Sequence, residues 1–464
     1  MKKSGLKLRI LARAALIIWL PSAIAAGCGR PAAPVLPVPT GRNIVLITID
    51  TLRAGHLSGY GYHRKTSPFL DSLAARGTLF SNASATSSWT PPSMASIFTG
   101  LYPRSHGVIY GQMDAARGKV MEQQMLVADF PVIAAHLAEN GYSTYGISTN
   151  LHMTAANGFD RGFHRFADLG FSRAPAANKA FAEMLPEIRE SRPYFLWIHY
   201  FDPHDPYYPC RPWINDYNPE KASYRRYSHK TMKKIRGMLD EIRADPAAPQ
   251  ILRDLYDSEI NYTDDHIREL VESLPDLDNT LIIVTADHGE EFLERGELGH
   301  GSSLFQEQVR VPLIVAPPGE ASAQVIEEAV SIVDIFPTIC QAAGLPLPPG
   351  LPGRSLLDRA AGEQRAIFAE LSRARTARQQ ESIRRGDWKF VQRGGRGERR
   401  ALYDLAGDPV EKNNLIEKDS DRARSLESEL ERWLEAHPLF EAPPADEPLG
   451  EKEIKELRSL GYLN

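Results

Sequence analysis

Two aspartates and a histidine follow apolar segments of this sequence, and together they could bind a divalent metal ion. Asp50 comes directly after residues 43–49, and Asp287 and His288 follow the run 281–285 by two and three positions. Two carboxylates and an imidazole suit an ion such as Mn, Zn or Mg. Taken alone, an Asp-His-Gly segment would be a turn with a capping aspartate. A second aspartate at a strand end favours the metal site.

A parallel β-sheet would bring these residues together, because ligands of such sheets bind beyond the carboxyl ends of the strands. β-rich apolar runs of the kind buried on both faces of a sheet occur at 43–49, 194–199, 281–285 and 311–315, and helix-like segments at 68–76 and 131–140. Strands that alternate with helices predict an α/β fold with a large, mainly parallel sheet sandwiched by helices. We expect Asp50, Asp287 and the segment from His199 to Asp205 at one edge of it.

The chain length predicts one large domain with a smaller appendage. A length of 464 residues is too great for one minimal domain. A Pro/Gly-rich stretch at 346–353 divides a catalytic domain, 43–350, from a small C-terminal α+β subdomain with a tail, 351–464. Residues 207–249 are rich in aromatic, basic and proline residues, and we expect a surface excursion near the site. The net charge of −5 gives no reason to expect a nucleic-acid partner.

The first 28 residues have the order of a signal peptide. Basic residues precede a short apolar run, and small residues lead to Cys28. The ending Ala-Ala-Gly-Cys is similar to a bacterial lipobox, so we expect export, with a lipid anchor at Cys28 facing the periplasm or cell surface. Ordinary cleavage, with Cys28 incidental, is the alternative. The Pro-rich residues 29–42 would form a tether.

Two further cysteines, Cys210 and Cys340, lie far apart in the sequence and have no metal-ligand spacing. We expect two buried thiols. A disulfide between them is the alternative in an oxidising compartment.

An ordered set of motifs resembles the sulfatase family of the alkaline-phosphatase superfamily. It comprises Ile49-Asp50-Thr51-Leu52-Arg53, the turn from Trp89 to Gly100, Phe201-Asp202-Pro203-His204-Asp205-Pro206, Thr285-Ala286-Asp287-His288-Gly289-Glu290 and Gly299-His300-Gly301. The resemblance runs from residue 43 almost to the end of the chain. It implies an alkaline-phosphatase/sulfatase-like fold and a metal-dependent hydrolase of sulfuric, phosphoric or phosphonic esters. The substrate would be a small-molecule, glycan or lipid ester.

The sequence departs from true sulfatases at the nucleophile. Thr90 matches the cysteine or serine that those enzymes convert to formylglycine in a Cys/Ser-x-Pro-x-Arg motif, and Met94 replaces the arginine. Leu101, Thr149 and Leu151 stand where arylsulfatases carry further cationic or polar groups. The resemblance is instead to superfamily members with a threonine nucleophile, which implies that Thr90 attacks the substrate and also binds the metal. Phosphorus esters would then be favoured over sulfate esters.

The motif positions also imply the remaining site residues. His204 and His300 match catalytic positions and would serve as general acids. Arg53 and Asn150 lie beside the matching segments, and we assign them to substrate binding. The metal set would be Asp50, Thr90, Asp287 and His288, which favours Mn, Zn or Mg over Ca.

Three other hypotheses remain. The chain could be a catalytically inactive sulfatase-like lipoprotein that acts as a binding module, a transferase of phospho groups, or a true sulfatase that uses Thr90 poorly. Thr90 could also simply cap a helix that begins at Pro91 or Pro92.

Overall fold

The computed structural model describes residues 41–109, 125–127, 129–319, 322–358, 364–372, 379–394 and 399–440. The signal segment with Cys28, nearly all of the tether and the tail after residue 440 lie outside the described residues, so these assignments remain predictions. Within the described ranges, no helix has both the length and the apolar composition that crossing a bilayer requires.

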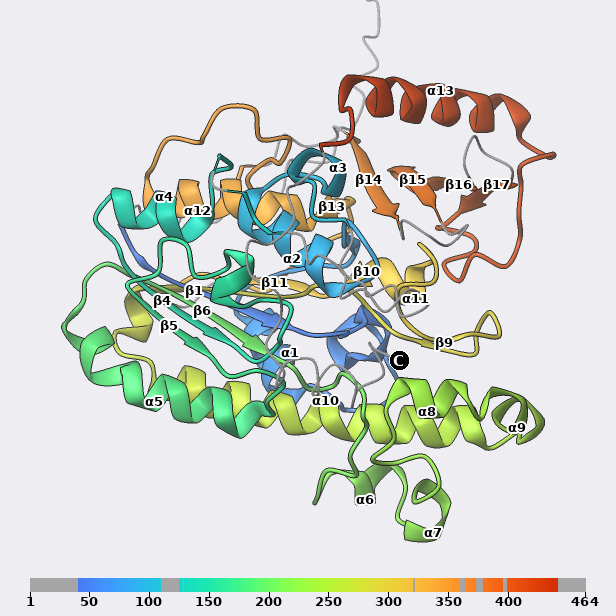
Figure 1. Ribbon diagram of the computed structural model, residues 1–464, viewed down its shortest axis with the longest axis horizontal. Helices are drawn as coiled ribbons and strands as arrows, with labels where there is room; N and C mark the ends of the chain where they lie inside the picture. Colours follow the sequence, from blue (N-terminus) through green and yellow to red (C-terminus); the bar gives the residue numbers. More distant parts are fainter. Residues whose placement is uncertain are drawn as a thin grey trace, which may run out of the picture.

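A sheet of eight strands forms the centre of the molecule (Figure 1). Side by side, the strands are β12 (Gln324–Ile326), β2 (Thr78–Phe80), β11 (Leu313–Ala316), β7 (Thr280–Ala286), β1 (Asn43–Ile49), β6 (Tyr194–Tyr200), β4 (Ser143–Ser148) and β5 (Arg165–Asp168). The five strands from β7 to β5 are parallel. All residues of β1, β6 and β7 are buried, as their continuous apolar sequences predict.

The predicted strand at 311–315 is the exception to this agreement. It is divided between β10 (Arg310–Val311), which joins a small separate sheet, and β11, which runs antiparallel to β7. Pro312 lies at the division, where a residue without a backbone N–H donor cannot complete a ladder of hydrogen bonds. The sheet is therefore mainly parallel, as predicted, but it carries an antiparallel strand.

Helices cover both faces of the large sheet (Figure 1). On one side lie α2 (Thr90–Thr99), α4 (Ile133–Glu139) and α12 (Ile335–Ala343), and on the other α1 (Pro68–Ala75), α5 (Ala174–Glu190) and α10 (Ala248–Ser273). The excursion at 207–249 contains four short helices, α6 (Ile214–Tyr217), α7 (Lys221–Tyr224), α8 (Met232–Arg236) and α9 (Leu239–Ala244). Cys210 and Cys340 are buried free thiols.

A second sheet follows in the C-terminal part of the chain. Its antiparallel strands are β14 (Ala366–Leu371), β15 (Gln380–Arg385), β16 (Trp388–Arg393) and β17 (Arg399–Asp404), and α13 (Ser420–Ala436) packs on it. Trp433 of α13 stacks on Phe368 with ring centroids 4.1 Å apart. Arg104, next to α2, reaches this sheet through an ion pair with Glu370 at 2.8 Å. The sheet and helix have the α+β composition predicted for this subdomain.

A buried ion pair within the C-terminal part lies where that part contacts the catalytic part. The Lys389 ammonium lies 2.7 Å from Glu411 and donates a hydrogen bond to the backbone carbonyl of Leu304 at 2.5 Å. Burial lowers the pKa of Lys389, and Glu411 opposes that shift.

We predict that Glu411→Gln destabilises the protein by roughly 3–5 kcal/mol, because it leaves a buried ammonium without a counter-charge. Chemical denaturation would measure the loss. The double variant Lys389→Met with Glu411→Gln should recover much of it. An unchanged unfolding midpoint in the single variant would show that this pair does not stabilise the fold.

Candidate metal and ester-hydrolysis site

The three predicted metal ligands meet at the carboxyl end of the sheet. Strands β1 and β7 pair in register, with Ile49 opposite Ala286, so Asp50 and Asp287 leave neighbouring strands at the same level. One potential ligand atom from each of Asp50, Asp287 and His288 lies within 4.8 Å of the other two. All three side chains are fully buried. The sequence predicted these residues at one edge of the sheet, and the strand register brings them close enough to share a metal ion.

In each of the carboxylates of Asp50 and Asp287, one oxygen accepts hydrogen bonds from the protein and the other does not. The amide of Asn150 donates to Asp50 Oδ2 at 2.6 Å, and His199 Nε2 lies 3.3 Å from the same oxygen. The backbone N–H groups of Thr51 and His288 donate to Asp287 Oδ1 at 3.2 and 2.9 Å. Among the described residues, Asp50 Oδ1 and Asp287 Oδ2 accept no hydrogen bond. Buried carboxylate oxygens of this kind call for a cation.

His288 is oriented as a metal ligand would be. Its Nδ1 lies 3.0 Å from the backbone carbonyl of Gly289, which fixes that nitrogen as the donor. Nε2 then carries the lone pair, and it lies 3.3 Å from Asp287 Oδ2 and 3.8 Å from Asp50 Oδ1. One nitrogen and two carboxylate oxygens fit a divalent ion of the kind expected from the sequence.

The electrostatics of the two carboxylates differ. Burial and the neighbouring Asp50 charge raise the pKa of Asp287. Burial would also raise the pKa of Asp50, but His204, His199 and His288 more than offset it and lower the pKa. Two like charges this close cannot both ionise easily without a compensating cation. The pair therefore fits a site whose partner is positively charged.

Thr90 lies beside this cluster. Its hydroxyl oxygen is 3.2 Å from His288 Nε2. The helix α2 starts at Thr90 itself, one or two residues earlier than predicted, and Trp89 is its N-cap, so Thr90 is not the capping residue. Its hydroxyl therefore lies at the positive end of a ten-residue helix, where negative charge is favoured.

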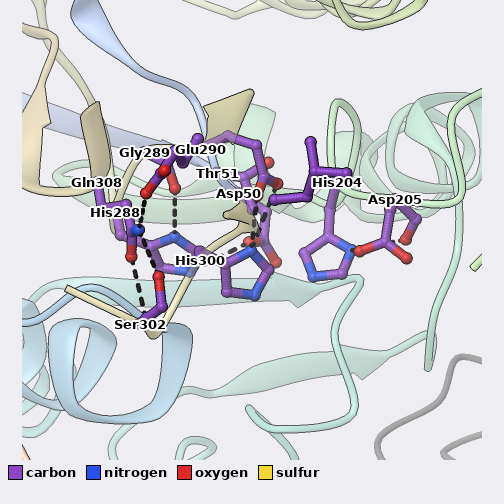
Figure 2. Close-up of polar contacts among 12 residues, drawn as sticks. Asp50, Thr51, His204, Asp205, His288, Gly289, Glu290, His300, Ser302 and Gln308 are labelled. Atoms are coloured by element: carbon purple, nitrogen blue, oxygen red, sulfur yellow. Dashed lines mark hydrogen bonds and ion pairs between the residues drawn. The ribbon is translucent and has the colours of Figure 1, made fainter. Parts of the chain in front are cut away.

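His204 and His300 lie beside the cluster (Figure 2). The ring of His300 is 4.5 Å from that of His288 and 5.0 Å from that of His204, centroid to centroid. His204 Nδ1 lies 2.6 Å from the backbone carbonyl of Asp205. Both predicted catalytic histidines are thus grouped with the metal-type cluster, although their segments are almost 100 residues apart.

Two further residues orient this site, and sequence reasoning gave neither a role. His300 Nδ1 lies 3.3 Å from both carboxylate oxygens of Glu290, which is fully buried. Burial, followed by the charge of Asp205, raises the pKa of Glu290. His199 contacts Asp50 and lies 2.9 Å from the Thr48 hydroxyl. Glu290 stands next to the Asp-His-Gly motif, a local signal that could have identified it. His199 is recognisable only once β1 and β6 pair.

The residues predicted to bind substrate occupy different places. Asn150 donates a hydrogen bond to Asp50, one of the predicted metal ligands. Arg53 donates to the Glu290 backbone carbonyl at 3.0 Å and to the Glu294 carboxylate at 2.8 Å. Contact of either residue with substrate remains a prediction. Arg236, from the excursion, donates to the backbone carbonyls of Leu298 and His300, so the excursion does reach the site.

Two of the positions at which the sequence departs from arylsulfatases, Met94 and Thr149, are fully buried. Met94 lies in the core, and the Thr149 hydroxyl donates to the His199 carbonyl at 2.7 Å.

Comparison with known proteins agrees with the sulfatase-family resemblance of the motifs. A family model described as Sulfatase matches residues 42–345, and one described as N-sulphoglucosamine sulphohydrolase, C-terminal, matches residues 300–437. Arylsulfatase K of Mus musculus is 32% identical over 183 residues, which cover 36% of this chain and only 33% of that protein. Choline-sulfatase of Rhizobium meliloti (strain 1021) is 26% identical over 450 residues, covering 82% and 83% of the two chains.

A solved structure shares the fold. The phosphonate monoester hydrolase of Silicibacter pomeroyi superimposes with a TM-score of 0.66 at 20% sequence identity, and the match covers 86% of this chain and 96% of that one.

We predict that Asp287→Asn and His288→Ala each lower bound divalent metal severely while the protein stays folded, since both side chains, although buried, lie just beyond the end of β7 and outside the apolar core. Elemental analysis of purified protein, with circular dichroism for folding, tests this. The control is His136→Ala, because His136 is partly exposed and its Nε2 lies 3.0 Å from the Pro346 carbonyl. This variant should keep its metal. Normal metal content in both site variants would refute the assignment.

Proposed function

Because the chain belongs to the sulfatase family, we propose that it is a metal-dependent ester hydrolase in which Thr90 is the nucleophile and phosphorus esters are the preferred substrates. Ester hydrolysis is the activity of the family and of its structural relatives. The substrate preference and the mechanism are our inference from the residues of the site.

One observation carries the assignment of the nucleophile. The Thr90 hydroxyl lies 3.2 Å from His288 Nε2, beside the carboxylates of Asp50 and Asp287 and at the N-terminus of α2. A divalent ion held by Asp50, Asp287 and His288, when bound, would lower the pKa of this hydroxyl and neutralise charge on the ester. The helix end favours both the threonine alkoxide and the incoming anion.

The proposed reaction has two steps. The Thr90 hydroxyl gives up its proton to solvent and its oxygen attacks phosphorus, the bond to the alcohol breaks, and His300 or His204 gives a proton to the leaving oxygen. Water then attacks the phosphothreonine and loses one proton to that histidine, which restores it. The bond from phosphorus to the Thr90 oxygen breaks, that oxygen takes up a proton from solvent, and the phosphate or phosphonate product leaves. Glu290 keeps His300 in place by its contact with Nδ1, so the other ring nitrogen is left to exchange the proton.

Threonine chemistry explains the preference for phosphorus. The hydrated aldehyde of a formylglycine can release sulfate by elimination. A threonine sulfate ester cannot release sulfate by this route. Hydrolysis of a phosphothreonine proceeds by direct attack of water on phosphorus, which threonine does not impede.

We predict that Thr90→Ala lowers turnover of an aryl phosphate ester by about three powers of ten or more, as removal of a catalytic nucleophile commonly does. The variant should retain its metal, because Asp50, Asp287 and His288 remain. Thr90→Ser, which keeps the hydroxyl, should retain part of the activity. Steady-state rates together with elemental analysis test this, and a fully active Thr90→Ala enzyme would exclude Thr90.

We further predict that the protein hydrolyses aryl phosphate monoesters, phosphodiesters or phosphonates faster than the matched aryl sulfate. The same aryl leaving group in all four esters makes kcat/KM comparable. If the sulfate ester is cleaved fastest, the threonine mechanism is wrong and the family assignment still stands. Binding of metal without turnover of any ester would favour a binding module instead.

A further inference from the structure

The turn that follows β1 is strained, and it contacts a candidate metal ligand on the neighbouring strand. Thr51, the residue after Asp50, has φ of 55°, in the left-handed region that β-branched residues rarely adopt. Its backbone N–H donates to Asp287 Oδ1 at 3.2 Å. This hydrogen bond depends on the backbone conformation of Thr51, so whatever holds that conformation also helps to orient the Asp287 carboxylate.

Tyr256 of α10 holds the turn from its other side. The Tyr256 hydroxyl donates to the Thr51 carbonyl at 2.6 Å and accepts from the Arg53 N–H at 3.0 Å. Burial raises the pKa of Tyr256, so the hydroxyl keeps the proton that it donates. The N–H of Thr51 is thus bound to Asp287 and its carbonyl to Tyr256. The backbone torsions of Thr51 lie between these two groups, and the two contacts fix them.

The ring of Tyr256 has separate contacts from its hydroxyl. The side chain is fully buried. The rings of His56 and Phe292 lie 5.2 and 5.0 Å from the Tyr256 ring, and the ring of Tyr207 lies 6.0 Å from it, centroid to centroid. A phenylalanine at this position would keep these contacts and would lose the hydrogen bonds to the turn.

The next residue of α10 anchors the helix to the same segment of the chain. Asp257 Oδ2 accepts from the Tyr62 hydroxyl at 2.8 Å and from the Arg64 guanidinium at 2.7 Å, and Oδ1 lies 2.6 Å from His56 Nδ1. The Asp257 side chain is fully buried. Tyr256 therefore cannot withdraw from the turn without loss of buried polar contacts, which are costly to leave unmade.

We propose that Tyr256 is a positioning residue of the metal site: its hydroxyl holds the strained turn at Thr51, and the turn holds Asp287 in the orientation that binds the divalent ion. Partners that orient a metal ligand in this way commonly change metal affinity by about ten- to a hundredfold when they are removed. The inference rests on the metal site of the proposed function. It does not depend on Thr90 as the nucleophile or on the kind of ester.

Binding of Mn²⁺ to the full chain tests this role without turnover. The protein is freed of metal with a chelator, and Mn²⁺ is then titrated by calorimetry. Tyr256→Phe should bind Mn²⁺ roughly tenfold or more weakly than the wild type, and circular dichroism should show that the variant is folded. A tyrosine that only filled the core would leave the affinity for Mn²⁺ unchanged when its hydroxyl is removed.

The matched control is Tyr194→Phe. Tyr194 is also fully buried, and its hydroxyl also donates to a backbone carbonyl, that of Pro275 at 3.1 Å. It is the first residue of β6 and so lies at the amino end of the parallel strands, at the opposite edge of the sheet from the metal site. This variant should bind Mn²⁺ as the wild type does.

A second substitution tests whether the turn carries the effect. Glycine adopts positive φ about as readily as negative φ, so Thr51→Gly removes the strain that Tyr256 opposes. In the Tyr256→Phe background, Thr51→Gly should recover part of the lost affinity for Mn²⁺. General loosening of the core would not be reversed by a glycine in the turn.

If Tyr256→Phe does not fold, amide hydrogen exchange of the metal-free wild type replaces it. Slow exchange at Thr51 and Arg53 would support a turn that is held before the metal binds, and rapid exchange at these amides would overturn the proposal.

Unchanged Mn²⁺ affinity in Tyr256→Phe would overturn the role of Tyr256, as would an equal loss in Tyr194→Phe or no recovery with Thr51→Gly. The proposed function would stand in each of these cases. A wild type that binds no Mn²⁺ would overturn both the metal site and this role. Selective loss of Mn²⁺ affinity in Tyr256→Phe, with a wild type that hydrolyses no ester, would refute the proposed function and leave the role of Tyr256 intact.

Discussion

The arrangement of the site depends on the close approach of two buried carboxylates. Asp50 and Asp287 extend from adjacent parallel strands, and water cannot solvate either. Such a pair is unfavourable unless protons or a cation compensate the charge. The protein supports one oxygen of each carboxylate with hydrogen bonds and directs the other toward His288. A metal ion is the compensation that this donor set fits, and Thr90 lies within its reach.

Local backbone strain accompanies this arrangement. Thr51 has φ of 55°, in the left-handed region that β-branched residues rarely adopt. Its N–H donates to Asp287, and its carbonyl accepts from the hydroxyl of Tyr256 on α10 at 2.6 Å. The surrounding structure therefore fixes the turn after β1, at a cost of order 1–3 kcal/mol for such a conformation. In return, the backbone N–H after Asp50 binds the second carboxylate directly.

Parts of the chain far from the sheet complete the surroundings of the site. Arg236 of the excursion donates to backbone carbonyls at Leu298 and His300, and the segment after His300 meets the C-terminal sheet through the hydrogen bond from Lys389 to Leu304. The candidate metal ligands lie at the strand ends. The excursion and the second sheet come from other parts of the chain than these buried strands.

The sequence by itself determined the fold class and most of the candidate site. Continuous apolar runs identify β1, β6 and β7, and the polar residues that follow them had to meet at the carboxyl ends of parallel strands. Only the tertiary structure decided the direction of β11, because an apolar run has no signature of strand orientation. It also decided the contacts of His199 and Glu290, which depend on register and on side-chain direction. The hydrogen bond from Lys389 to Leu304 lay beyond sequence analysis for the same reason, since the two residues are 85 positions apart and meet only when the two parts of the chain pack together.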